Sequence, residues 1–171
     1  GQGSVRAQLH TLSVSEPFHT VAIDFAGPLP EDADGNKFII AVEDCFTKFT
    51  ILRATPGTSA IDTAKVLLEV FGTFGAPALI HTDRGTEFNN RLIHNLLTFL
   101  GTSHEMTLAY RPQANGMVER LNREIKRHLR SLVADHRLHQ HWSLALPMVQ
   151  RILNASYHSA TGMAPARLMF G

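Results

Sequence analysis

Hydrophobic and polar residues are arranged along the chain in a pattern that predicts an α/β fold. Residues 18–26, 37–43 and 46–54 are rich in β-branched and aromatic types and are separated by turn signals. They predict three strands joined as an antiparallel meander. Two short apolar runs, at 78–82 and 102–108, predict two further strands.

Helical periodicity predicts four helices between and after these strands. The first would be capped by Thr58 or Ser59 and run to about Phe74. Its expected core face consists of Ile61, Ala64, Leu67, Leu68 and Phe71. The other three helices are expected at 88–100, at about 117–135 and at roughly 140–158, the last broken or kinked at Pro147. A tail from Thr161 onward is expected to be irregular. This order predicts a five-stranded mixed sheet with helices on both faces.

The composition fits one globular domain. The chain has 171 residues, of which 44% are hydrophobic, and no apolar run approaches the roughly 18 residues of a membrane helix. We expect residues 1–16 to be an N-terminal extension or vector-derived residues, and residues 17–171 to form the core. A soluble intracellular protein with no membrane partner is expected. Cys45 is the only cysteine, which excludes an internal disulfide within this sequence and predicts a buried strand residue.

Charge is unevenly distributed along a chain whose net charge is only +1. Residues 1–58 carry four basic against seven acidic residues, whereas residues 110–137 carry seven basic against three acidic ones. The basic segment is typical of a phosphate-binding surface, and it is equally typical of a solvated helix face. Charge alone does not decide between these interpretations.

Two aspartates occupy positions that need an explanation. Asp24 lies in the middle of an otherwise apolar predicted strand, where an ionised carboxylate costs several kcal/mol unless it is paired or binds a metal. Asp83 ends a predicted buried strand just before Arg84 and Gly85, where α/β sheets commonly place functional groups. Taken singly, Asp83 is better explained as a turn or helix-cap residue.

Glu119 lies near the start of a predicted helix that has one apolar and one basic side. The basic side, within about 80° of Glu119 on the helical wheel, contains Asn122, Arg123, Lys126, Arg127 and Arg130. A carboxylate followed by a basic track suits metal binding beside a polyanion. An ordinary amphipathic helix with a Glu119–Arg123 pair explains the pattern equally well.

Three segments also carry a family resemblance. They are DFAGPLP from Asp24, TDRGTEF around Asp83 and YRPQANGMVERLN from Tyr110, which contains Glu119. Together they resemble the catalytic core of DDE-type integrases of gypsy-class LTR retroelements and, more distantly, of retroviruses. Thirty-five residues separate Asp83 from Glu119, the interval of the D,D-35-E signature. The closing segment from His158 to Gly171 resembles the end of such cores.

The resemblance implies a ribonuclease-H-like fold and a polynucleotidyl transferase. Asp24, Asp83 and Glu119 would be the catalytic residues and would hold two Mg²⁺ or Mn²⁺ ions. The implied reactions are 3′-end processing of element DNA and its transfer into target DNA. DNA would be the main partner, and a nuclear location is expected.

The resemblance also suggests that the loop from Tyr110 to Gly116 meets DNA through Tyr110 and Gln113, although a plain connector has the same composition. Integrase cores typically form two-fold dimers, so a homodimer or higher oligomer is expected, with Trp142 as a possible anchor. Two other functions stay open: a domesticated or inactive core acting as a DNA-binding or interaction module, and a structural dimerisation unit.

Overall fold

The computed structural model describes residues 16–107, 123–131 and 139–171 and contains a five-stranded mixed sheet. The strand order is β3-β2-β1-β4-β5. The strands are β1 (Thr20–Ala26), β2 (Phe38–Asp44), β3 (Thr50–Thr55), β4 (Leu79–Thr82) and β5 (Ser103–Met106). β1, β2 and β3 pair antiparallel, and β4 and β5 are added parallel to β1. The predicted meander and mixed sheet are therefore confirmed.

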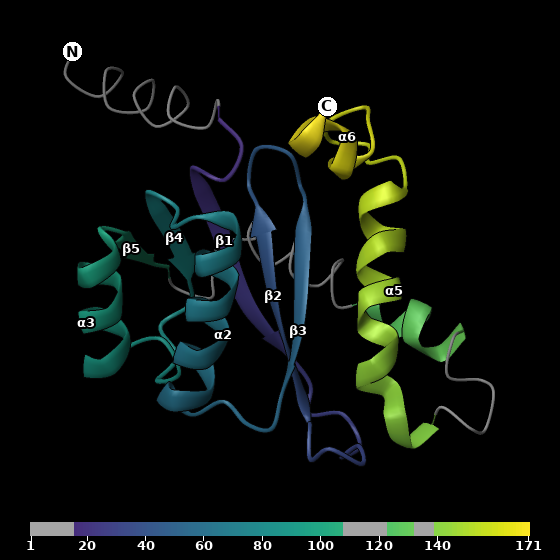
Figure 1. Cartoon of the computed structure of the whole chain (residues 1–171), viewed down its shortest axis with the longest axis horizontal. Helices are drawn as coiled ribbons and strands as arrows, with labels where there is room; N and C mark the ends of the chain where they lie inside the picture. The colour runs from purple at the N-terminus through teal and green to yellow at the C-terminus, as the bar shows by residue number, and fades with distance from the viewer. Residues whose placement is uncertain (1–15, 108–122, 132–138) are drawn as a thin grey trace.

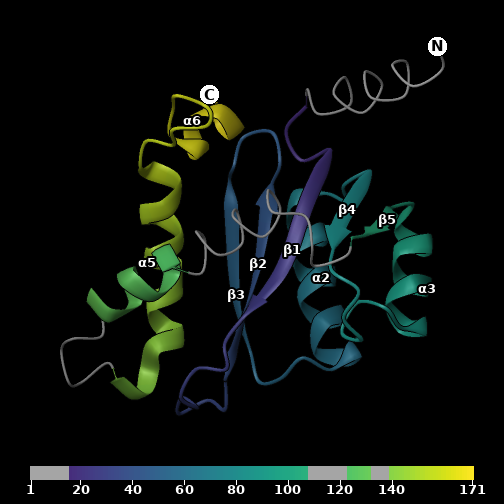
Figure 2. The same cartoon turned by 180° about the vertical axis from the view of Figure 1, so that it is seen from behind.

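Helices cover both faces of the sheet (Figures 1 and 2). One face carries α2 (Ala60–Phe74) and α3 (Arg91–Leu100), and the other carries the helical segment 123–131 and α5 (Trp142–Ala155). A short 3₁₀ turn, η1 (His139–His141), precedes α5, and α6 (Pro165–Phe170) follows it.

The two faces of the sheet belong to two separate hydrophobic cores, because side chains alternate along each strand. On β1, Val21 and Ile23 pack with α2 and α3, whereas Ala26 packs with Ile125, Leu129 and α5. Asp24 is two residues from Ala26, so both side chains are on the sheet face opposite to that of Val21 and Ile23. Asp24 therefore belongs to the face that bears the segment 123–131.

α2 matches its predicted bounds, but its predicted core face is partly wrong. Ser59 caps the helix by accepting a hydrogen bond from the Asp62 amide. Leu67 and Phe71 are buried as expected, whereas Ile61 and Leu68 are 56% and 49% exposed. Thr63 and Val70 are buried instead. The helix is thus rotated about its axis relative to the prediction, because its crossing over the sheet selects the buried face.

Three local predictions also need correction. α3 begins at Arg91 with Asn90 as its cap, because Phe88 is used in the preceding turn, where it is fully buried. The tail is not wholly irregular, since it contains α6. Cys45 lies in the turn after β2 and is only half-buried, although burial still raises the pKa of its thiol to about 11.

The outer edge of β3 is closed by side chains from α5. The Asn154 side chain accepts a hydrogen bond from the Thr50 amide and donates one to the Thr50 carbonyl, both at 2.8 Å. Gln150 accepts from the Leu52 amide at 2.9 Å. These amide side chains replace the partner strand that an edge lacks, which blocks pairing with a strand of another chain here.

No helix in the described part of the chain is long and apolar enough to cross a membrane.

Candidate active site

Asp24 on β1 and Asp83, directly after β4, are brought to the same level by the pairing of these parallel strands. The register sets Ala22 opposite His81. Continued for two residues, it sets Asp24 opposite Asp83. Since residues two apart in a strand share a face, both carboxylates are directed to the face that bears the segment 123–131. Neighbouring strands lie about 4.8 Å apart, so two negative charges converge here.

Burial and neighbouring charge act together on Asp24. They raise the pKa of its carboxyl to about 6, with burial as the largest cause and the charges of Asp83 and Glu87 adding to it. A hydrogen bond from the Phe25 amide opposes the rise. An acid in this environment gains stability from protonation or from a bound cation.

The turn that presents Asp83 is fixed by local hydrogen bonds. The Gly85 amide donates to Asp83 Oδ1 at 2.8 Å, and the amide of Phe88 donates to the Gly85 carbonyl at 3.1 Å. Phe88 is fully buried and its ring lies 5.5 Å from that of Phe25, the neighbour of Asp24. The turn is therefore anchored to β1 through two aromatic side chains, which holds the two aspartates in a fixed relation.

Glu87 is a third acidic residue of this turn. Its carboxylate lies against Gly85, where the Cβ of any larger residue would collide with it. Its charge contributes to the raised pKa of Asp24. The Glu87 side chain is half-buried, and it lies close enough to Asp24 for its charge to be felt there.

Residues 14–112 match the family model of the integrase core domain, which is more than half of the chain. The chain belongs to the integrase core family.

Known relatives agree in sequence and in fold. This integrase core is 34% identical to the Pro-Pol polyprotein of simian foamy virus type 3 (strain LK3) over 91% of the chain, and it spans only 13% of that polyprotein. It is similar in fold to the catalytic core domain of BIV integrase, with a TM-score of 0.71, 23% identity and coverage of 89% of this chain and 93% of that one. The fold is ribonuclease-H-like, as predicted, whereas the narrower resemblance to gypsy-class elements remains a prediction.

A second structural relative is the HTLV-2 integrase catalytic core domain, described in complex with magnesium in a trimeric form. The TM-score is 0.74 at 19% identity, with coverage of 91% of this chain and 98% of that one.

Glu119, the third predicted catalytic residue, lies outside the described residues. The helical segment that follows it in sequence is described from residue 123, and it packs through Ile125 and Leu129 onto the sheet face that bears Asp24.

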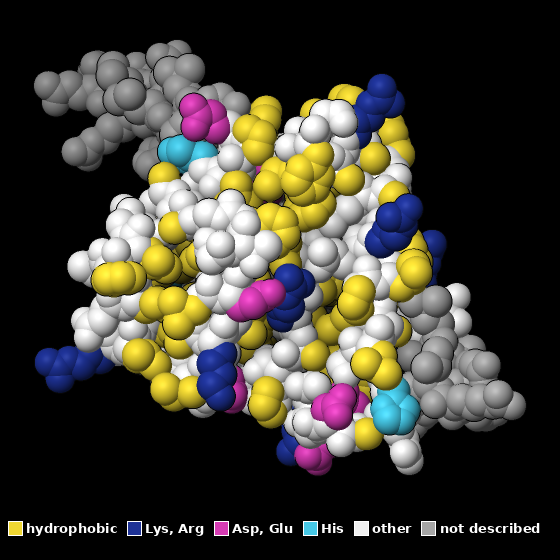
Figure 3. Space-filling model, viewed as in Figure 1, with side chains coloured by type: hydrophobic (Ala, Val, Ile, Leu, Met, Phe, Trp, Pro, Cys, Tyr) yellow, Lys and Arg dark blue, Asp and Glu magenta, His cyan; other side chains and the backbone are white. Residues whose placement is uncertain are grey.

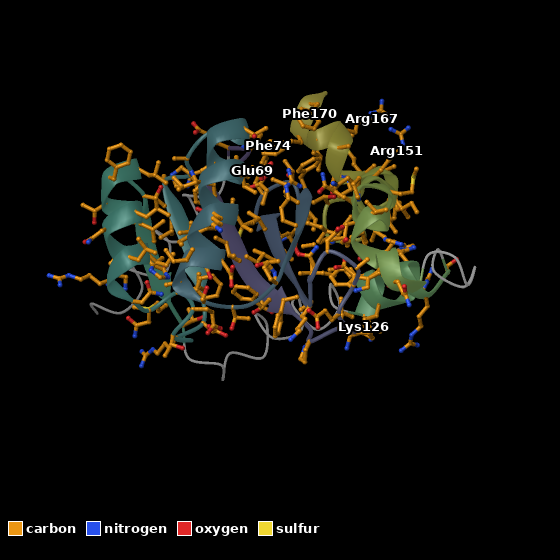
Figure 4. The ribbon with its side chains drawn as sticks, turned by 60° about the horizontal axis from the view of Figure 1, so that its bottom comes forward. Glu69, Phe74, Lys126, Arg151, Arg167 and Phe170 are labelled. Carbon is orange, nitrogen blue, oxygen red and sulfur yellow. The ribbon has the colours of Figure 1, made fainter. Side chains whose placement is uncertain are left out.

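The predicted DNA-contact residues divide into two groups. Tyr110, Gln113 and Asn122 lie outside the described residues. The basic residues predicted to share a face of the helix are all exposed, and they are Arg123, Lys126, Arg127 and Arg130. Figure 4 labels Lys126 on this segment. The predicted basic side of the helix therefore faces solvent, where phosphate groups can reach it.

One pair near the site was missed from the sequence. His81 lies two residues before Asp83, and its Nδ1 is 3.7 Å from the Glu105 carboxylate of β5. The register places these two residues opposite each other. Alternation within the strand could have indicated that His81 shares a face with Asp83, but its pairing with Glu105 depends on the order of β4 and β5 in the sheet.

The two aspartates fit a divalent cation, although the described residues contain no complete set of ligands. No group of three or more His, Cys, Asp or Glu residues that could hold a metal is found in the ranges 16–107, 123–131 and 139–171. Asp24 and Asp83 supply hard oxygen donors, and the raised pKa of Asp24 reflects a cluster of negative charge that a cation would relieve.

Proposed function

We propose that this integrase core is a divalent-metal-dependent polynucleotidyl transferase, which processes the 3′ ends of element DNA and joins them to target DNA. The observation that carries the proposal is the convergence of Asp24 and Asp83 at one level of the parallel pair β1–β4, in a chain of the integrase core family. A domesticated or inactive core is not favoured, because the family match and both described acidic residues fit the enzyme.

Asp24, Asp83 and Glu119 would hold the metal ions, either Mg²⁺ or Mn²⁺. The magnesium complex of the HTLV-2 integrase core supports this choice. Bound ions would supply Lewis-acid stabilisation of the attacking and leaving oxygens in an in-line displacement. With its pKa near 6, Asp24 is ionised at neutral pH and offers a carboxylate to a cation. The bond from the Gly85 amide fixes the orientation of the Asp83 carboxylate for the same task.

The basic side of the segment 123–131 would bind the DNA backbone. Arg123, Lys126 and Arg130 are exposed on the helical segment 123–131, which follows Glu119 in the sequence. Phosphate contacts of this kind position DNA without reading its sequence. Tyr110 and Gln113 would lie near the scissile end, and the substrate implies a nuclear location.

Self-association would use the surface formed by α2 and α5 on either side of β3. Trp142, the anchor suggested by the sequence, is unsuitable, because its ring is 5% exposed and its Nε1 donates to the Pro30 carbonyl at 2.7 Å. Other hydrophobic side chains are available: Leu68 of α2, and Leu144 and Met148 of α5, are 49%, 66% and 52% exposed. Figure 3 shows hydrophobic side chains gathered along the line between α2 and α5.

Metal-dependent cleavage and strand transfer test the proposed reaction. A short duplex with one labelled strand would be incubated with wild type and with Asp24→Asn, Asp83→Asn and Glu119→Gln, in Mg²⁺ or Mn²⁺ and in EDTA. We expect activity only for wild type with metal. A single variant that keeps more than about a tenth of the wild-type rate, a barrier change under about 1.4 kcal/mol, would remove that residue from the site.

A further inference from the structure

Acidic and basic residues are unequally distributed between the layer that contains the sheet with α2 and α3 and the layer that contains α5 and α6. Residues 16–107, which form the sheet with α2 and α3, carry twelve acidic and six basic residues. Residues 139–171, which include α5 and α6, carry two arginines and no acidic residue. Both arginines, Arg151 and Arg167, are exposed and project from α5 and α6 (Figure 4). The helical layer formed by the segment 123–131, α5 and α6 is therefore suited to binding polyanions over a wider area than the segment 123–131 alone.

A cleft of about 350 Å³ opens into this layer. Its walls are the β2–β3 hairpin, the segment 123–131, and the connection between α5 and α6. The lining residues are Glu43, Lys48, Thr50, Glu124, Arg127, His128, Leu153, Ser156, Tyr157, His158, Ser159 and Pro165. The volume lies at the lower end of the range for small-ligand sites.

The cleft borders the candidate active site but is not lined by its two aspartates. Its hairpin wall lies beside the start of β1, since Glu43 pairs with Ala22. Asp83 follows the end of β4, which runs parallel to β1. Ala22 and Asp24 are two residues apart on β1, so Glu43 lies on the same face as Asp24 and diagonally next to it, whereas Lys48 lies farther away in the hairpin turn.

The chemistry of the lining matches one nucleotide unit. Lys48 and Arg127 are cations that can contact a phosphate, and Tyr157 offers an aromatic ring that is 73% exposed at the rim. An exposed tyrosine next to cations is the arrangement on which unpaired bases stack. Two carboxylates, Glu43 and Glu124, also line the cleft, and a carboxylate can accept hydrogen bonds from base amino groups.

The wall that carries Tyr157 is held in place by backbone hydrogen bonds. The His158 amide donates to the Met163 carbonyl at 3.0 Å, and the Gly162 amide donates to the His158 carbonyl at 2.8 Å. The Ser156 amide donates to the Ile152 carbonyl at 3.1 Å, which ties the wall to the end of α5. A preformed wall reduces the ordering that binding would require.

We propose that this cleft binds an unpaired nucleotide of a DNA strand, with the base stacked on Tyr157 and its phosphate held by Lys48 and Arg127. It rests on the proposed function for its substrate class, and it adds a contact for an unpaired nucleotide beside, but outside, the pair Asp24 and Asp83. A concave site of this size admits one base, whereas a paired duplex presents only its backbone to the rim.

Fluorescence anisotropy of a labelled single-stranded oligonucleotide, measured in EDTA, tests the cleft. Tyr157→Ala should weaken binding at least about fivefold, the lower end of the loss expected for one stacked base. Tyr157→Phe, which keeps the ring, should stay within about twofold of wild type. Lys48→Ala should reduce the slope of log affinity against log salt by about 0.7. A blunt-ended duplex should bind Tyr157→Ala as well as it binds wild type.

Phe99→Ala is the matched control, because Phe99 is an aromatic residue on α3 that is 86% exposed. It should bind the single strand like wild type. Wild-type affinity in Tyr157→Ala, or an equal loss in Phe99→Ala or on the duplex, would overturn the cleft assignment. If wild type still cleaves DNA with metal in that case, the transferase stands without the cleft. If the Tyr157 variants behave as expected but wild type shows no metal-dependent cleavage, the cleft stands and the transferase fails.

Discussion

At the scale of single residues, the environment of the Asp24 carboxyl group on β1 explains why this residue is proposed as a metal ligand. The sequence places an acid between Ile23 and Phe25, and the structure shows that this position is half-buried and close to Asp83 and Glu87. The need for an explanation could be seen from the sequence, because a charge in an apolar strand is costly. The contribution of Glu87 could not be seen, because it depends on how the turn after β4 folds back over Gly85.

The raised pKa of Asp24 makes the stability of the metal-free protein depend on pH. The folded-state pKa is about 6 and the unfolded value about 3.8, so the folded state binds the proton more tightly. The stabilisation from protonation is complete below pH 3.8 and is lost as the pH rises through 6. Asp24→Asn should therefore be more stable than wild type at pH 7.5 in EDTA, by at most about 3 kcal/mol, and about equally stable near pH 4.

Urea unfolding at the two pH values measures this difference. Glu31→Gln is the control, because Glu31 is an exposed carboxylate whose ion pair with Lys37, at 4.0 Å on the surface, contributes little to stability. A variant Asp24→Asn that is less stable than wild type at pH 7.5 would mean that the ionised carboxylate has a favourable partner in the metal-free fold.

At the scale of elements, strands and caps were predictable, whereas helix orientation was not. The Ser59 cap and the end of α3 at Gly101 follow from local chemistry, and both are as expected. The exposure of Ile61 and Leu68 depends on how α2 crosses the sheet. Glu69 gives a second example, because helical spacing alone would pair it with Lys65. Glu69 instead binds Arg53 of β3 at 3.0 Å, a partner distant in sequence.

The helical segment 123–131 yields a prediction about DNA affinity. Lys126→Ala and Arg130→Ala should each weaken binding of duplexes of unrelated sequence and lower the salt slope by about 0.9, because each removes one phosphate contact. Arg91→Ala, at an exposed position at the start of α3 on the other face of the sheet, serves as the control. Unchanged affinity and slope in both variants would show that this helix face is merely solvated.

At the scale of the whole molecule, the sheet topology determines which distant residues meet. The order of elements along the sequence predicted a mixed sheet, but it did not predict that β4 pairs with β1 and that β5 pairs with β4. These two pairings bring Asp24 beside Asp83 and His81 beside Glu105. The resemblance could assign Asp24 and Asp83 to one site, whereas the neighbouring cleft left no recognisable motif in the sequence.

The closed edge of β3 leads to a prediction about self-association. Because Asn154 and Gln150 already occupy its backbone groups, copies of the chain should associate through helices rather than by strand pairing. Leu68→Glu or Met148→Glu should shift sedimentation at tens of micromolar from dimer or larger species toward monomer. Phe99→Glu, at an exposed position on α3, should leave the distribution unchanged. A wild type that sediments only as monomer would contradict this surface.

The central claim is that Asp24 and Asp83, with Glu119, form a site for divalent cations, and a thermal-shift titration with Mg²⁺ or Mn²⁺ at constant ionic strength tests it most directly. Binding at one hundred times the dissociation constant stabilises the folded state by about 2.7 kcal/mol per site, or roughly 5–10 °C for a chain of this size. We expect that rise for wild type and for the control Glu31→Gln, and loss of most of it for Asp24→Asn and for Asp83→Asn. If Asp24→Asn responds to the metal as fully as wild type does, Asp24 is not a ligand and the proposed metal site is wrong.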